Sequence, residues 1–330
     1  MSNTRTYFSK WWLWLSCALL LSAYIGISCG TMRVPWQEII AVIFGDAGSS
    51  LHEVVILKIR LPRVLFAALV GASLSVSGAA FQAVLRNPLA DPYILGVSGG
   101  AALGSVLAIT IGGYSVFILP ASAFSGALIA LLAVYMVARS SRGDSHTLIL
   151  AGVMVGSLAS ALLLFFLWLA PSDSVRNAVF WLAGNLSNVR VDWLPWGYGA
   201  SLIAFLVLWR NSRVLDLFTQ GEDCAADLGL DVAKARLLVF AAAGMLVAIA
   251  VSMAGLVGFV GLVIPHVVRL LWGPDHARLL PAAALAGAAF LVLADALSRV
   301  VLAPAELPVG VVTALIGAPF FLYLLRLRGE

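Results

Sequence analysis

Charged residues are scarce in this chain of 330 residues. Only 11% are Asp, Glu, Lys or Arg, whereas 62% are hydrophobic, and the mean hydropathy is +1.02. Soluble domains carry about a quarter charged residues. The composition therefore excludes a soluble globular enzyme and predicts an all-α, polytopic membrane protein.

Lysine and cysteine are scarcer still. None of the three lysines, Lys10, Lys58 and Lys234, follows a glycine, so the phosphate-binding pattern G-x-x-x-x-G-K-[ST] is absent. If this chain is part of an ATP-driven pump, another polypeptide must supply the ATPase. The three cysteines have no metal-ligand spacing and indicate no disulfide framework. The basic residues punctuate apolar spans rather than cluster, so they give no sign of nucleic-acid binding.

Apolar runs of about membrane length follow one another along the chain and predict about ten transmembrane helices. We expect them at roughly 11–30, 62–84, 93–111, 114–138, 147–170, 193–210, 235–255, 258–272, 280–300 and 308–326. The third and eighth are short or glycine-rich, and a helix at 174–185 is too short to span. We interpret the first run as an uncleaved helix rather than a signal peptide. No soluble domain fits, so residues 1–330 are expected to form one transmembrane domain.

Loop charge predicts the orientation. Most of the basic residues fall on the side of the N-terminus, which places both termini in the cytoplasm. Two segments, Arg63–Gly78 and Arg236–Gly255, share a basic, apolar and then small-residue pattern but run in opposite directions. This pattern favours inverted-topology repeats, which are common in transporters.

The most distinctive segment begins with Arg60-Leu61-Pro62-Arg63. An apolar run broken by Gln82 follows it and ends at Arg86-Asn87-Pro88-Leu89-Ala90-Asp91-Pro92. Arginines sit at membrane edges because they are costly at mid-bilayer depth. Two prolines four residues apart prevent a continuous helix through the turn. The segment is typical of a gate or a partner-docking element.

Three further features have alternative interpretations. Gly96-Val97-Ser98-Gly99-Gly100 matches a nucleophile pattern, but a nucleophile needs a base, and we favour close helix packing. Asp295 and Arg299 can pair on one helix face, or Arg299 can reach outward to an acidic partner. The polar segment Asp216–Gly229 is either a pair of short cytosolic helices capped by glycine or a solvated loop.

Several motifs together carry a family resemblance. They are Arg60–Gly100, Trp181-Leu182-Ala183-Gly184, Gly221–Gly229, Gly255–Arg269 and Glu306-Leu307-Pro308-Val309-Gly310. Over roughly residues 12–328 the chain resembles the cobalamin, haem and ferric-siderophore permeases of bacterial ABC importers. The resemblance implies a fold of ten helices, a homodimer or pseudo-dimer around the pathway, and a place in the bacterial inner membrane. It also implies two cytosolic ATPase subunits, which would bind ATP and magnesium, and a periplasmic binding protein. This chain itself would bind no cofactor or metal.

The resemblance also assigns roles to residues. Arginines that meet the binding protein's glutamates match Arg60, Arg63 and Arg299. A cytosolic gate matches Asn87 and Leu89 together with Asp144 and Ser145, where the cobalamin member has a Ser-Thr pair instead. The ATPase-coupling element matches the segment that contains Asp216, Gly221, Glu222, Asp223, Leu228 and Gly229.

We therefore expect a permease subunit, not an enzyme, that imports an iron chelate (haem or ferric siderophore), with cobalamin as the second choice. An ion-coupled secondary transporter would need an ionisable residue at mid-bilayer depth, and Asp295 is the candidate. An intramembrane serine protease would need a histidine beside Ser98.

Overall fold

The computed structural model describes residues 3–30, 32, 34–44, 50–111, 117–140, 145–187 and 190–328, which form helices and connecting turns without a strand. The helices in chain order are α1 (Asn3–Ser28), α2 (Trp36–Phe44), α3 (Ser50–Val54), η1 (Val55–Arg60), α4 (Leu61–Val84), η2 (Pro92–Leu95), α5 (Val97–Ile111), α6 (Ile118–Ser140), α7 (Ser145–Leu169), α8 (Ser172–Leu182), η3 (Val191–Trp193), α9 (Leu194–Arg210), α10 (Ser212–Gln220), α11 (Glu222–Asp227), α12 (Val232–Ala254), α13 (Val260–Trp272), α14 (His276–Ser298) and α15 (Val309–Arg328).

Seven helices in the described residues are long and apolar enough to cross a membrane, and three are shorter. The seven lie at Trp11–Ser28, Leu51–Val84, Ile118–Arg139, His146–Leu169, Val191–Arg210, Val232–Ala254 and His276–Ser298, and the three at Val97–Ile111, Val260–Trp272 and Val309–Leu324. Together they match the ten expected spans. A helix of 15 residues such as α5 covers about 22 Å, less than the roughly 30 Å of a hydrocarbon core. The irregular segments next to the short helices must complete those crossings.

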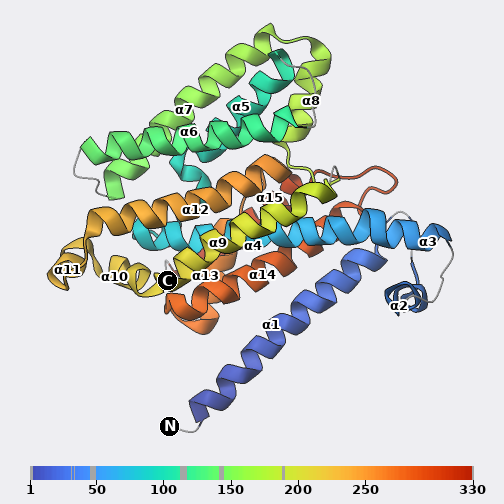
Figure 1. Ribbon diagram of the computed structural model, residues 1–330, viewed down its shortest axis with the longest axis horizontal. Coiled ribbons are helices and arrows are strands. Elements are labelled where there is room, and N and C mark those ends of the chain that lie inside the picture. The colour runs from blue at the N-terminus through green and yellow to red at the C-terminus, as the bar shows by residue number, and fades with distance from the viewer. Residues whose placement is uncertain are drawn as a thin grey trace.

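Helix α4 forms the centre of the molecule. Of the 24 residues of α4, 20 are buried, and α4 packs against α12, α13 and α14 (Figure 1). Close packing depends on glycine: a Cβ at Gly71 would overlap the carbonyl oxygen of Gly287, and one at Gly78 would overlap that of Gly261. Small residues let membrane helices approach to backbone contact.

The helix that contains α4 begins earlier than expected. We expected a span from residue 62, but α3, the π-helical η1 and α4 form one continuous helix from Ser50 to Val84. Pro62 does not end it because the wider π-helical turn precedes it and Pro62 stands in the first turn of α4. The Arg60–Arg63 pair therefore lies within a long helix rather than at its entrance.

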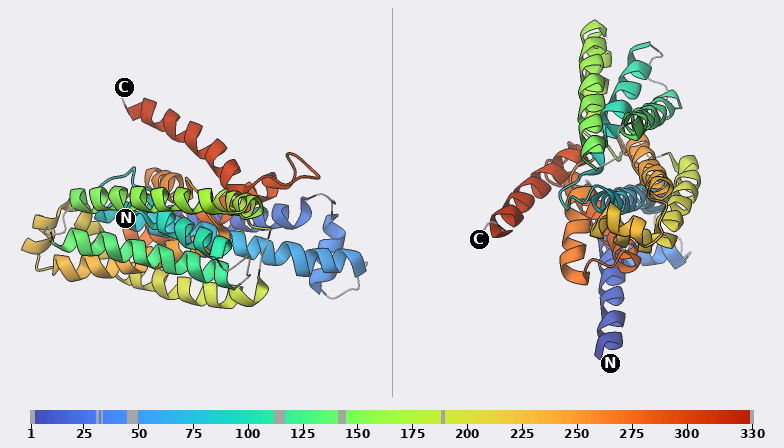
Figure 2. Two further views of the ribbon diagram at one scale, coloured as in Figure 1. Left: turned by 90° about the horizontal axis from the view of Figure 1, so that it is seen from above. Right: turned by 90° about the vertical axis from the view of Figure 1, so that its left-hand side faces the viewer.

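The expected inverted arrangement is visible. Helices α4 and α12 lie side by side and run in opposite directions, and each leads through an irregular segment into a short helix, α5 or α13 (Figure 1). Helices α5–α8 form a separate layer on one side of this core. Figure 2 shows α7 and α15 diverging from the core and from each other.

The two ends of the molecule are distinct. Both chain termini lie toward the end that carries α10 and α11, whereas α2 and α3 lie at the opposite end (Figures 1 and 2). We name them the α11 end and the α3 end.

Candidate functional site

A cluster of three arginines and two carboxylates lies at the α3 end. Arg63 on α4 pairs with Asp295 on α14 (2.8 Å) and with Glu306 in the following loop (2.9 Å). Arg299 pairs with Asp295 at 3.2 Å, as the spacing of four residues indicated. We call Arg60, Arg63, Asp295, Arg299 and Glu306 the arginine cluster. It ties α4 to the C-terminal end of α14.

Two of these arginines cap the C-terminus of α1. Arg60 Nη1 donates to the carbonyl oxygens of Ile27 (2.6 Å) and Ser28 (2.9 Å). Arg299 donates to those of Gly26 and Cys29, each at 2.9 Å. The last carbonyl groups of a helix have no partner within the helix and carry partial negative charge. The arginines supply both the hydrogen bonds and the opposite charge.

This arrangement differs from the expected docking surface. We expected Arg60, Arg63 and Arg299 to present free charge at the rim, but their exposed fractions are only 5%, 7% and 4%. A buried guanidinium needs internal partners, because an unpaired buried charge is costly. The acidic partners of Arg63, Asp295 and Glu306, lie 232 and 243 positions away in the sequence. Glu306 is the more accessible carboxylate of the cluster, with 38% of its side chain exposed.

The turn Arg86–Pro92 joins α4 to η2 and is held by local hydrogen bonds. The Oδ1 atom of Asn87 accepts from the backbone N–H of Leu89 (2.9 Å), and that of Asp91 accepts from Tyr93 (2.8 Å). Arg86 has a left-handed φ of +50° and an exposed side chain. Burial raises the pKa of the Asp91 carboxyl to about 6, against the opposing effect of the Tyr93 hydrogen bond.

Gln82, the polar interruption of α4, has a defined role in the structure. Its Nε2 atom lies 3.4 Å from the carbonyl oxygen of Gly261 and 3.3 Å from that of Leu262. Pro265 in α13 has no N–H, so the carbonyl of Gly261 lacks its partner within the helix. Gln82 therefore supplies a donor where α13 cannot.

The segment Asp216–Gly229 forms helix rather than loop. Its two short helices, α10 and α11, meet at Gly221, where φ is +120°, and α11 ends at Asp227, two residues before Gly229, where φ is +85°. Asp223 and Leu228 are exposed, whereas the carboxylate of Glu222 pairs with the buried Arg236 of α12. The segment thus presents an exposed face at the α11 end while it is anchored to a spanning helix.

The predicted gate turn and the predicted coupling segment are neighbours. A Cβ at Gly221 would lie 3.7 Å from Nη1 of Arg86. Of the two remaining gate residues, Asp144 lies outside the described residues, and Ser145 is the first residue of α7. The structure therefore brings the side chain of Arg86, the residue before Asn87, close to the coupling segment.

Asp216 makes a second anchor for this segment. Its Oδ1 atom lies 2.6 Å from Nδ1 of His276 and accepts from the backbone N–H of the same residue at 3.0 Å. Burial would raise the pKa of Asp216, but the hydrogen bonds and charge of His276 outweigh it and hold that pKa below its usual range. His276 is only 1% exposed. The pair fixes α10 to the first turn of α14.

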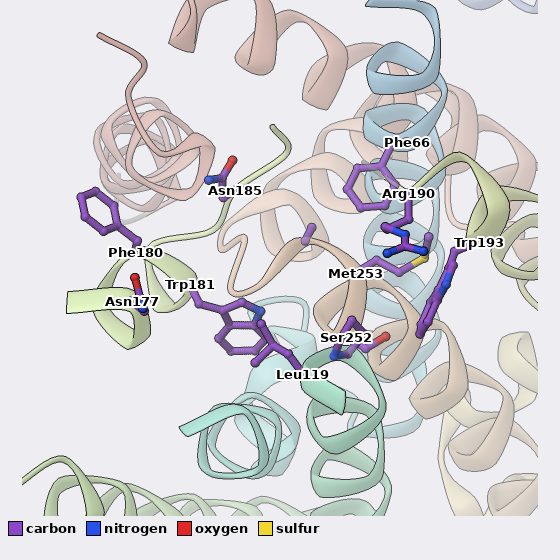
Figure 3. A pocket seen from close by; sticks show the side chains of 12 residues that line it. Phe66, Leu119, Asn177, Phe180, Trp181, Asn185, Arg190, Trp193, Ser252 and Met253 are labelled. Atoms are coloured by element: carbon purple, nitrogen blue, oxygen red, sulfur yellow. The ribbon is translucent and has the colours of Figure 1, made fainter. Parts of the chain in front are cut away.

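A cavity of about 370 Å³ lies toward the α3 end between α4, α6, α8, η3 and α12 (Figure 3). Its walls are aromatic or apolar, and its polar side chains include Asn177, Asn185 and Arg190. The Arg190 guanidinium also lies 4.6 Å from the centre of the Phe117 ring. Among the described residues that line the cavity none is acidic, so it favours groups that accept hydrogen bonds.

The Gly96–Gly100 motif serves helix packing. Gly96 has a left-handed φ of +73° and ends η2, and a Cβ at Gly100 would overlap the carbonyl oxygen of Gly126 in α6. Ser98 and Gly99 line a groove against α7. The packing interpretation of this motif is confirmed by these contacts.

Sequence reasoning missed three of these residues. Glu306 belongs to a motif that has no assigned role, no motif includes His276, and Gln82 stands only as a polar interruption of an apolar run. A polar residue that faces a proline-containing helix is a usable signal for the last of them. For Glu306 and His276 no pattern in the sequence identifies the partner.

Comparisons with known proteins agree with this geometry. The model of the FecCD transport family matches residues 18–327. The cobalamin import system permease protein BtuC of Halobacterium salinarum is 46% identical over 277 residues, which are 84% of this chain and 74% of that protein. The vitamin B12 import system permease protein BtuC of Escherichia coli is 40% identical over 324 residues, 97% of this chain and 96% of that protein. A solved structure, described as a metal-chelate type ABC transporter in an inward-facing conformation, covers 97% of this chain and 99% of its own at 33% identity, with a TM-score of 0.85.

Proposed function

Since this chain belongs to the FecCD transport family of ABC importer permeases, we propose that it forms a membrane pathway for a metal chelate, driven by ATP hydrolysed on partner subunits. The observation that carries the coupling role is the α10–α11 segment. It is an ordered pair of helices with an exposed face, anchored to α12 through Glu222 and Arg236. The cytosolic ATPase, with its ATP and magnesium, docks on this face.

The α11 end and both termini are then cytoplasmic, and the α3 end faces the periplasm. Large apolar side chains on the diverging helices α7 and α15 support a second copy of the chain as a partner. They include Leu150, Met154, Leu158, Trp168, Leu315, Leu322 and Tyr323. A homodimer would cover part of this apolar surface and enclose the pathway between the two copies.

The substrate is a corrinoid or an iron chelate. Two relatives at 40% and 46% identity carry names of cobalamin permeases, which favours a corrinoid. Haem or a ferric siderophore, expected first from the sequence, is the second candidate.

The test is uptake into proteoliposomes that contain the permease and its ATPase, with cyanocobalamin, haem and a ferric siderophore compared at equal concentrations. We expect ATP-dependent uptake of only one of the three substrates, and we expect that substrate to be cyanocobalamin. Gly229→Val, which forces a β-branched residue into a left-handed conformation, should lower uptake but not membrane insertion. Uptake driven by a proton or sodium gradient without the ATPase would instead favour the secondary transporter.

Docking of an acidic binding protein depends on charge at the arginine cluster. The cluster holds three guanidinium groups and two carboxylates. Glu306, the more exposed carboxylate, forms an ion pair with Arg63. Glu306→Gln should therefore strengthen docking at low salt, because it makes the cluster more positive. The matched control is Asp173→Asn, which removes an exposed carboxylate paired with Arg176 on α8. If the wild type and Glu306→Gln bind the binding protein with equal affinity, the arginine cluster only stabilises the fold and takes no part in docking.

A further inference from the structure

The inner end of α14 is held by two side chains from neighbouring elements. Asp216 of α10 binds the backbone N–H and the imidazole of His276, at 3.0 and 2.6 Å. Trp209, near the end of α9, donates its indole N–H to the carbonyl oxygen of Ala277 at 3.0 Å. Both contacts use groups in the first turn of α14. The helix start is therefore fixed to the coupling segment and to the helix that precedes it.

Both contacts fill positions that α14 leaves open. The first N–H groups of a helix have no acceptor within it, and Asp216 supplies one to His276. Pro281, inside α14, has no N–H to give to the carbonyl four residues earlier, which belongs to Ala277. Trp209 supplies that donor. The two side chains thus hold α14 by backbone groups that would otherwise lack a partner within the helix.

Helix α14 is rigidly joined to α4 along its length. The carbonyl of Gly287 fits directly against Gly71 near the middle, and Asp295 pairs with Arg63 at the far end. The 23 residues of α14 correspond to about 34 Å. A displacement of the inner end therefore moves the outer end, because close-packed helices do not deform continuously.

We propose that Asp216 and His276 are positioning residues that pass the movement of the coupling segment to α14, and through it to the arginine cluster. The proposal rests on the proposed coupling function of α10 and α11. Helix α14 is then the physical link between the ATPase face and the binding-protein face. The exposed residues of α11 bind the ATPase, and Asp216 transmits the movement of the coupling segment to α14.

The experiment measures linkage between the two faces. In the reconstituted permease–ATPase complex, binding-protein affinity is determined with and without a non-hydrolysable ATP analogue, and the ratio of the two affinities reports the coupling. The wild type should give a ratio different from 1. Asp216→Ala should bring the ratio to nearly 1, with ATPase co-purification unchanged. Asp216→Asn should stay within about twofold of the wild type, because the amide oxygen still accepts from His276.

Trp209→Phe is the second variant, since it removes only the indole N–H. It should bring the ratio of the two affinities closer to 1, while an aromatic ring stays at this position. The inference is overturned if Asp216→Ala keeps the wild-type ratio, or if Asp216→Ala and Asp216→Asn lose it equally. Loss of ATPase binding in Asp216→Ala would also overturn it, because Asp216 would then belong to the docking face. If Asp216→Ala does not fold, a wild-type ratio in Trp209→Phe overturns it. A wild-type ratio of 1 contradicts the proposed function itself.

Discussion

Single polar side chains in this protein satisfy carbonyl groups that helix ends and prolines leave without a partner. Gln82 serves the carbonyl that Pro265 leaves free in α13, and Trp209 serves the one that Pro281 leaves free in α14. Arg60 caps α1 in the same way. Unsatisfied backbone groups are costly in a bilayer. These interruptions of apolar runs are therefore structural in origin.

The arginine cluster gives a residue-scale prediction about stability. Asp295→Leu leaves Arg63 and Arg299 without their shared buried carboxylate, and should lower the free energy of unfolding by about 3–5 kcal/mol. Glu306→Gln affects the same Arg63 but changes a partly exposed group, and should cost at most about 1 kcal/mol. Thermal unfolding in detergent compares the two. Equal shifts in Tm would contradict the buried position of Asp295.

Asp91 gives a prediction about pH. Its folded pKa of about 6 exceeds the ordinary value of 3.8, so ionisation disfavours the folded state. The associated stability is fully present below about pH 3.8 and is lost as pH rises through about 6. Asp91→Asn cannot ionise and keeps an oxygen for the Tyr93 N–H. Above pH 6 it should raise the free energy of unfolding by at most about 3 kcal/mol, seen as a higher Tm, and near pH 4 it should change little. A constant difference across this range would refute the raised pKa.

At the scale of elements, the contact between α4 and α13 depends on a missing side chain. Gly78→Ala places a methyl group on the carbonyl oxygen of Gly261, so α4 and α13 must separate. We expect a loss of about 1–3 kcal/mol in stability, as for other overpacked sites. Gly199→Ala in α9 is the matched control, because nothing lies within 4 Å of the added atom. Comparable Tm values for the two variants would show that α4 and α13 are not in backbone contact.

At the scale of the whole molecule, two copies should place the turn Arg86–Pro92 at the cytoplasmic mouth of the pathway. Cysteines at Asn87 or Leu89 should then crosslink between copies in some nucleotide states and not in others, because residues near a two-fold axis meet their own counterparts. Cys17, Cys29 and Cys224 are replaced first, since Cys17 and Cys224 are exposed. A crosslink that forms equally with and without ATP analogue would make the turn a static cap.

The sequence by itself determined the class of protein, the order of the ten spans and two of the three shorter ones, and it left Asp216–Gly229 open between a helical pair and a loop. These follow from local properties, namely the length of apolar runs, the positions of glycine and proline, and family motifs. The Asp295–Arg299 pair could also be predicted from the sequence, because four residues separate the two on one helix.

Only the tertiary structure decided where the side chains of Arg60, Arg63 and Arg299 go. Arg63 and Asp295 are 232 positions apart in the chain, and Asp216 and His276 are 60 apart. The periodicity of the sequence does not predict such pairs, because they depend on which helices pack together and on which residues then lie at the same level. The family resemblance assigned these arginines to docking, whereas the packing of α1, α4 and α14 buries them. A guanidinium at a helix junction is more stable with nearby carbonyl and carboxylate oxygens than without a partner.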